Sequence, residues 1–115
     1  MPAILPKSEV MMTLNDAERR QTSDELQTNF ALSGLTTAEV AADLHFTPQR
    51  LHSALEADPT CDPVDVWQLR DYLIQAVRDA GHQPAPFTVL TQRSRLKARV
   101  WFSLRKAPRH DFAAP

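Results

Sequence analysis

Apolar residues in the middle of the chain recur with the spacing of two short helices joined by a turn. Between residues 37 and 56 they form two groups, each on one helical face: Val40, Ala41 and Leu44, then Leu51, Ala54 and Leu55. The break at residues 45–46 is followed by Thr47 and Pro48, a hydroxyl cap and a proline at the first helical position. A small residue at position 41 lets steeply crossing helices approach closely. The segment therefore predicts a helix-turn-helix.

Longer helices are predicted on both sides of this segment. The first begins at Asn15-Asp16 and stops at Gly34, and the capping-box pattern of residues 22–25 predicts a break and restart inside it. The second begins at the capping Asp62, runs from Pro63 to Ala80, and has a continuous apolar stripe: Val66, Leu69, Leu73, Ala76, Val77 and Ala80, widened by Trp67 and Ile74. The predicted fold is mainly α, a small helical bundle with a helix-turn-helix core and a C-terminal basic extension.

The pattern is weaker after Gly81. Prolines make residues 82–86 an extended connector, and residues 87–90 favour a short extended segment. Over residues 93–105 apolar positions recur every fourth residue, which favours a helix, and also alternate with polar ones, which favours a strand. Residues 107–115 are expected to be frayed. The chain is thus divided into a flexible tail (1–12), a helical helix-turn-helix domain (13–83) and a partly packed basic extension (84–115).

The charges are divided between the two ends of the chain. The formal net charge is −1, but residues 1–79 hold 6 Lys/Arg and 13 Asp/Glu, whereas residues 80–115 hold 7 Lys/Arg and 1 acidic residue. A basic tail of this kind meets nucleic acid, an acidic partner or its own acidic body, and all three alternatives stay open. Within the long C-terminal helix, Arg70 and Asp71 are expected to form an ion pair.

The composition argues against an enzyme, a cofactor site and a metal site. The 115 residues suffice for one domain, and a single cysteine cannot form an internal disulfide. Cys61 lies between Asp58 and Asp62, which would raise its pKa, and the four histidines lack the spacing of metal ligands. No apolar run has membrane-spanning length and no secretion signal is visible, so we expect a cytoplasmic protein.

Three separated blocks, ELQTNFALSGLTTAEVAADL, DVWQLRDYLIQAV and PAPFTVL, occur here in that order. In these blocks the chain resembles a family of small bacterial proteins catalogued as domain of unknown function 2316, over a stretch from about Leu14 to about Leu104. The resemblance implies a small helical cytoplasmic protein with a helix-turn-helix-like centre. It implies no activity, cofactor or catalytic residue.

A helix-turn-helix presents the early residues of its second helix to DNA. The candidates for base contacts are Gln49, Arg50, His52 and Ser53, with Thr47 and again Arg50 as candidates for phosphate contacts. Further phosphate contacts are assigned to basic residues that could lie beside the second helix: Arg93, Arg95, Lys97 and Arg99, followed by Arg105, Lys106 and Arg109. The nearby acids Glu39, Asp43 and Glu56 argue against DNA binding, because their negative charges repel a duplex.

Two functions therefore remain for this sequence. The leading hypothesis is a DNA-associated transcriptional regulator, paired as a homodimer as small helix-turn-helix proteins commonly are. The alternative is a protein-interaction or adaptor module that uses the helix-turn-helix only for packing and does not bind DNA.

Overall fold

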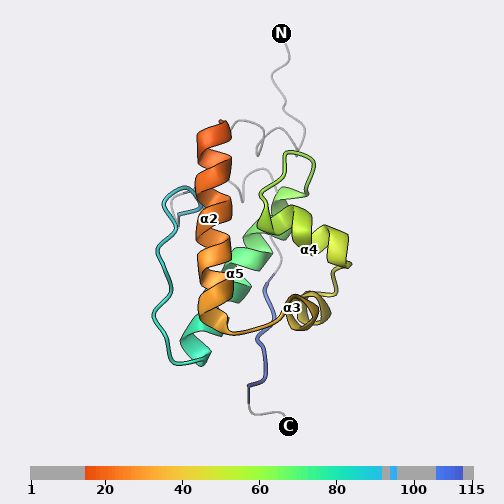
Figure 1. The fold of residues 1–115 in the computed structure, drawn as a ribbon, viewed down its shortest axis with the longest axis vertical. Helices are drawn as coiled ribbons and strands as arrows, with labels where there is room; N and C mark the ends of the chain where they lie inside the picture. The colour runs from red at the N-terminus through yellow and green to blue at the C-terminus, as the bar shows by residue number, and fades with distance from the viewer. Residues whose placement is uncertain (1–14, 92–93, 96–105, 113–115) are drawn as a thin grey trace.

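The computed structural model describes residues 15–91, 94–95 and 106–112. Within these ranges the chain forms no strand and four longer helices: α2 (Asp16–Ser33), α3 (Thr37–Leu44), α4 (Pro48–Leu55) and α5 (Pro63–Asp79). The two long helices, α2 and α5, pack along each other, and the short α3 and α4 lie together beside them (Figure 1). The prediction of a mainly α fold is confirmed.

Each helix begins at the polar residue that the sequence marks as its cap. At the start of α2, the Asn15 side chain accepts a hydrogen bond from the Glu18 amide at 2.7 Å, and the Glu18 carboxylate accepts one from the Asn15 amide at 3.0 Å. A cap of this kind stabilises a helix by about 1 kcal/mol. The other three helices have equivalent caps: Thr36 with Glu39 at α3, Thr47 before Pro48 at α4, and Asp62 before Pro63 at α5.

The predicted break inside α2 is wrong, because the helix continues through residues 22–25. Thr22 and Ser23 face the interior instead of capping a new helix. The Ser23 hydroxyl donates to the carbonyl oxygen of Leu55 at 2.8 Å, so it supplies a partner for the end of α4. Ser23, which belongs to the capping-box pattern, therefore makes a tertiary contact instead of capping a helix.

A three-residue turn, residues 45–47, joins α3 to α4. His45 ends α3 with φ 59°, in the left-handed region that costs a non-glycine residue about 1–2 kcal/mol. The next residue, Phe46, is buried and its amide donates to the Ala41 carbonyl at 2.9 Å, which anchors the turn. In Figure 1, α3 is seen nearly end-on while α4 lies across the view, so the two helices cross steeply.

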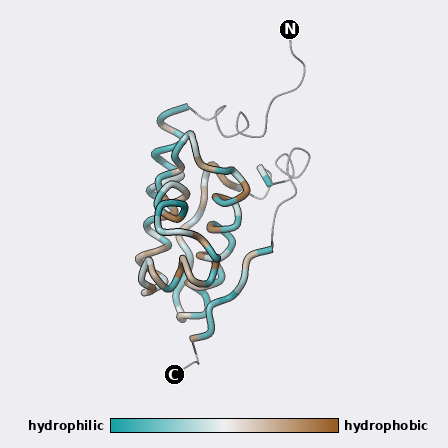
Figure 2. Tube along the Cα trace, turned by 90° about the vertical axis from the view of Figure 1, so that its right-hand side faces the viewer, coloured by the Kyte–Doolittle hydropathy of each residue, from teal (hydrophilic) through white to brown (hydrophobic). Residues whose placement is uncertain are grey.

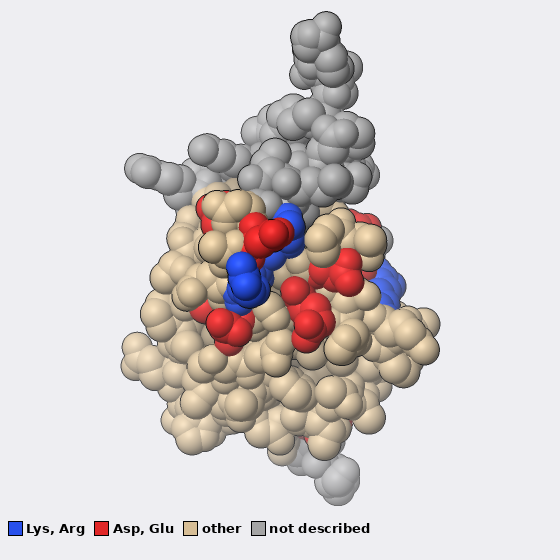
Figure 3. Space-filling view, turned by 45° about the horizontal axis from the view of Figure 1, so that its top comes forward, with Lys and Arg blue, Asp and Glu red and all other residues tan. Residues whose placement is uncertain are grey.

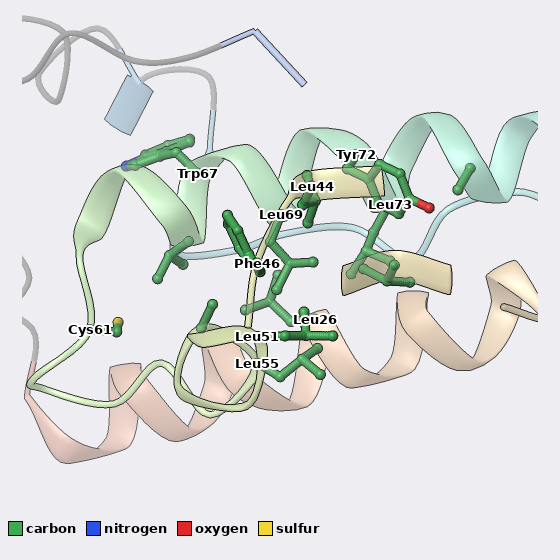
Figure 4. Packing of buried hydrophobic residues seen from close by; sticks show 14 of the residues in the cluster. Leu26, Leu44, Phe46, Leu51, Leu55, Cys61, Trp67, Leu69, Tyr72 and Leu73 are labelled. Atoms are coloured by element: carbon green, nitrogen blue, oxygen red, sulfur yellow. The ribbon is translucent and has the colours of Figure 1, made fainter. Parts of the chain in front are cut away.

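The hydrophobic core lies where α2, α4 and α5 meet. Leu26, Leu51 and Leu69 each expose 2% of their surface or less and lie close together in Figure 4. Trp67 and Tyr72 are also buried, as the apolar stripe of α5 predicts.

Residues 82–91 connect back along α2, on the side away from α3 and α4 (Figure 1). The Asn29 side chain both donates to the Ala85 carbonyl (3.1 Å) and accepts from the Ala85 amide (2.9 Å). One turn earlier, the Glu25 carboxylate accepts from the amide and the hydroxyl of Thr88. Residues 88–90 bend, so the short extended segment predicted there is wrong. Side chains of α2 hold this connector.

Residues 106–112, which we call the C-terminal segment, lie against both α3 and α5: the segment passes beside these helices in Figure 1 and runs down one side of the molecule toward the C-terminus in Figure 2. Its contacts reach both helices: Gln68 and Asp79 on α5, and Asp43 on α3. Ala107 packs against the core. The expectation of fraying is therefore wrong for residues 107–112, because distant polar groups hold them.

Candidate functional site

The α4 residues predicted to meet base edges lie on its solvent side. Gln49 and His52 are exposed, and Ser53 is half-buried. The hydroxyl of Thr47, the candidate phosphate contact, accepts from the Arg50 amide at 3.1 Å as the helix cap. The structure thus brings these residues to one short surface at the start of α4.

Arg50 points from α4 to α5. Its Nε and Nη2 atoms each donate to a carboxylate oxygen of Asp65 at 2.7 Å, and its guanidinium lies 4.2 Å above the Phe46 ring. The hydrogen bonds to Asp65 raise the pKa of Arg50. Because the Asp65 side chain is 5% exposed, the pair neutralises a buried acid. The contacts of Arg50 therefore stabilise the fold.

A small groove lies between α3 and α4. Its volume is about 310 Å³, and it is lined from both helices: Thr37, Ala38 and Ala41 on α3, and Pro48, Leu51, His52 and Leu55 on α4. Ala38 is exposed at its edge, whereas Leu51 and Leu55 belong to the core. The groove is large enough for at least one apolar side chain, and no polar side chain apart from Thr37 and His52 lines it.

Arg95 is one of the predicted phosphate contacts that the structure describes. It forms an ion pair with Asp71 on α5 and its guanidinium lies 5.0 Å from the Trp67 ring. Asp71 also pairs with Arg70 at 2.8 Å, so the predicted Arg70–Asp71 pair is confirmed. Of the other predicted phosphate contacts, Arg109 pairs with Asp79, and Arg93, Lys97, Arg99 and Arg105 lie outside the described residues.

Arg70 is a buried cation that anchors the end of the connector. It is 6% exposed, and burial lowers its pKa despite the adjacent Asp71. Its Nε donates to the Leu90 carbonyl at 2.7 Å, and its guanidinium lies between the rings of Trp67 (5.5 Å) and Phe87 (5.3 Å). Its contacts are structural, since they satisfy the charge within the protein.

Asp43 joins three parts of the chain, a role that the sequence did not reveal. Its Oδ2 atom accepts from the Tyr72 hydroxyl at 2.6 Å and lies 2.7 Å from Nδ1 of His110. Burial, followed by the hydrogen bond to Asp43, raises the pKa of Tyr72. No local spacing marks this cluster, because its members lie 29 and 67 residues from Asp43.

A polar cleft of about 540 Å³ lies between the first half of α2 and residues 56–59. Acidic and basic side chains are mixed on the face shown in Figure 3. The cleft lining has the same mixture, with Arg19 and Arg20 beside Asp16, Asp24 and Glu56. Such a surface gives no field of a single sign to attract a polyanion.

Cys61 is buried, and burial with the nearby Asp58 raises its pKa to about 12. This confirms the sequence expectation for the thiol. Among the described residues, no cluster of three or more His, Cys, Asp or Glu residues has the geometry of a metal site. Nor does any helix in the described part combine the length and apolarity needed to cross a membrane.

Comparison with known proteins identifies a family. Neither the curated proteins nor the solved structures contain a match to this chain. One family model does match, over residues 12–103, which is most of the chain and agrees with the resemblance seen in the sequence. The chain therefore belongs to the family of uncharacterized proteins conserved in bacteria, domain of unknown function 2316.

Proposed function

We propose that this chain is a cytoplasmic protein-interaction module whose α3–α4 groove holds an apolar side chain of a partner polypeptide. The observation that carries the proposal is the groove itself, an apolar hollow of about 310 Å³ between two exposed short helices. Grooves of this kind bind peptides through one or a few apolar anchors. The anchor would contact the methyl groups of Ala38 and Ala41 and the side chain of Leu51.

Charge supports a polypeptide partner rather than a duplex. Residues 37–57 contain the acids Glu39, Asp43 and Glu56. The arginine in that range, Arg50, is already paired with Asp65. Non-specific DNA binding needs several cations to neutralise phosphates. The lining of the groove, which contains no Asp, Glu, Lys or Arg, is instead suited to an apolar side chain of a peptide.

The test compares two exposed alanines of α3, only one of which lines the groove. Peptides are selected from a displayed random library against the full chain, and their affinities are then measured for Ala38→Arg and Ala42→Arg. Because both substitutions add the same side chain to the same helix, they match in charge and in helix propensity. We expect Ala38→Arg to weaken binding at least about tenfold, since it fills the groove, and Ala42→Arg to leave it within about twofold.

The result that contradicts the proposal is equally specific. Failure to enrich any peptide, or equal losses from the two substitutions, would exclude the groove as the docking site. Circular dichroism of both variants checks that α3 remains folded, which is expected because both positions are exposed.

A DNA-associated regulator is the second candidate. It is favoured by the exposure of Gln49 and His52 on the solvent side of α4, where a recognition helix presents its contacts. The test is titration of duplex DNA at several salt concentrations, for which each phosphate contact adds about −0.9 to the log–log slope. Binding that weakens on Gln49→Ala with His52→Ala would support this candidate, and no binding at low salt would exclude it.

A further inference from the structure

Helix α3 has one side at the α3–α4 groove and another at the C-terminal segment. Thr37, Ala38 and Ala41 line the α3–α4 groove. Glu39 and Asp43 lie one turn apart and point to the other side, because successive helical residues are turned by about 100°. That second side faces the C-terminal segment, through Asp43 and His110.

The C-terminal segment holds α3 and α5 together through side chains of both helices. On α5, Gln68 Nε2 donates to the Lys106 carbonyl at 3.1 Å, and Asp79 accepts from Arg109 Nη2 at 2.5 Å. On α3, Asp43 lies 2.7 Å from His110, and the Glu39 carboxylate is 3.9 Å from the same ring. Helix α3 itself packs mainly on α4 and is joined directly to α5 by the hydrogen bond from the Tyr72 hydroxyl to Asp43, to which the bridges through the C-terminal segment add.

The segment does not fill the space in which it lies. A cleft of about 500 Å³ remains between residues 43–45, Gln68 and residues 106–109. The buried Oε1 atom of Gln68 has no hydrogen-bond partner among the described residues. Asn29 provides the comparison within this chain, because its amide contacts both the carbonyl and the N–H of Ala85. The Gln68 side chain, in contrast, hydrogen-bonds the carbonyl of Lys106 but not its N–H.

We propose that residues 106–112 are a detachable clasp that fixes α3 against α5 and thereby sets the shape of the α3–α4 groove. The regulatory part of this inference rests on the proposed function, because it concerns the same groove. The incomplete contact at Gln68 and the exposure of Arg109, whose side chain is 64% exposed, make release inexpensive. When the clasp leaves, α3 loses its link through His110 and moves more freely relative to α4.

Amide hydrogen exchange of the full chain tests the clasp. The variant Arg109→Ala with His110→Ala removes the two side chains through which the segment contacts Asp79 and Asp43, and both lie outside the core. We expect the amides of residues 40–44 to exchange at least about tenfold faster, while those in the middle of α2 and α5 change by less than about twofold. Lys106→Ala is the matched control, because Lys106 is held through its backbone carbonyl and its exposed side chain has no role in the clasp.

The groove is followed in the same samples without any partner. Methyl NMR signals of Ala38, Ala41 and Leu51 should shift in the double variant and stay in place in Lys106→Ala. Unchanged exchange in α3, exchange that rises equally in all helices, or unmoved methyl signals would each overturn the proposal. The peptide selection described above fails or succeeds independently, so the failure of the proposed function is distinguishable from the failure of the clasp.

Discussion

Arg50 donates two hydrogen bonds to Asp65 at a site where the side chain of the aspartate is 5% exposed and that of the arginine 36% exposed. A carboxylate at that depth is costly unless a cation accompanies it. The Phe46 ring on the other side of the guanidinium limits its movement further. At the scale of single residues, this pair explains why an arginine at a predicted DNA-reading position serves stability.

Replacing Arg50 should therefore affect folding before it affects any binding. We expect Arg50→Ala to lower the free energy of unfolding by about 2–4 kcal/mol, because it leaves the Asp65 carboxylate buried and unpaired. Urea denaturation measures this loss. The adjacent exposed residue is the control, and Gln49→Ala should stay within about 0.5 kcal/mol. Equal stabilities of the two variants would contradict the structural role assigned to Arg50.

At the scale of elements, α2 is a helix whose buried face is mostly polar, with Leu26 as its buried apolar residue. Asn29 is fully buried and hydrogen-bonds both backbone groups of Ala85, and the Glu25 carboxylate accepts from the amide and the side-chain hydroxyl of Thr88. The connector has no regular secondary structure over residues 82–87, so these side chains replace the partners that a strand or helix would provide. Helix α2 therefore holds the connector by specific hydrogen bonds as well as by packing.

Truncation of Asn29 should loosen the connector. We expect Asn29→Ala to cost about 2–3 kcal/mol, since it removes two hydrogen bonds and leaves the Ala85 amide without its partner. The neighbouring Thr28→Ala, on the exposed side of α2, should cost about 0.5 kcal/mol or less. Thermal denaturation of the two variants makes the comparison, and similar melting temperatures would show that the connector does not depend on Asn29.

The helix ends could be predicted from the sequence because their causes are local. The side chains of Asn15 and Thr36 accept hydrogen bonds from amides three residues later, so the capping residues can be recognised in the sequence. Ser23 was misread because its partner, the Leu55 carbonyl, lies 32 residues away. Spacing predicted the close crossing of α3 and α4 but not the groove left between them, and the Asp43 cluster joins residues 29 and 67 positions apart, which no local pattern marks.

At the scale of the whole molecule, the basic C-terminal part meets the acidic body within the described residues. Arg95 pairs with Asp71, and Arg109 pairs with Asp79, both on α5. This contact is one of the three alternatives that the charge division left open. It uses cations that would otherwise be available to an external polyanion.

The pKa shifts predict a stability maximum between about pH 5 and pH 8. Hydrogen bonds from Arg109 and from the Thr36 backbone lower the pKa values of Asp79 and Glu39, so their contribution is lost as the pH falls below about 4. Burial raises the pKa of Cys61 to about 12. Above about pH 8.5 the unfolded thiol therefore ionises while the folded one stays neutral, and stability falls. Burial also raises the pKa of Tyr72, so ionisation of this residue in the unfolded chain lowers the stability further at higher pH.

Urea denaturation at pH values from 3 to 10 measures this profile. The variant Cys61→Ala is the control for the alkaline side, where its stability should decline less steeply than that of the natural chain. An identical alkaline slope in both proteins would rule out the thiol as the cause.

The hydrogen bonds between α2 and the connector also bear on the order of folding. They join Asn29 to Ala85 and Glu25 to Thr88, across 56 and 63 residues of chain. Closing a loop of that length costs chain entropy before any contact compensates for it. Local helices and their caps carry no such cost. We expect the connector to dock after the folding transition state, with φ-values near zero at Asn29, and to open before the packed helices when the protein unfolds.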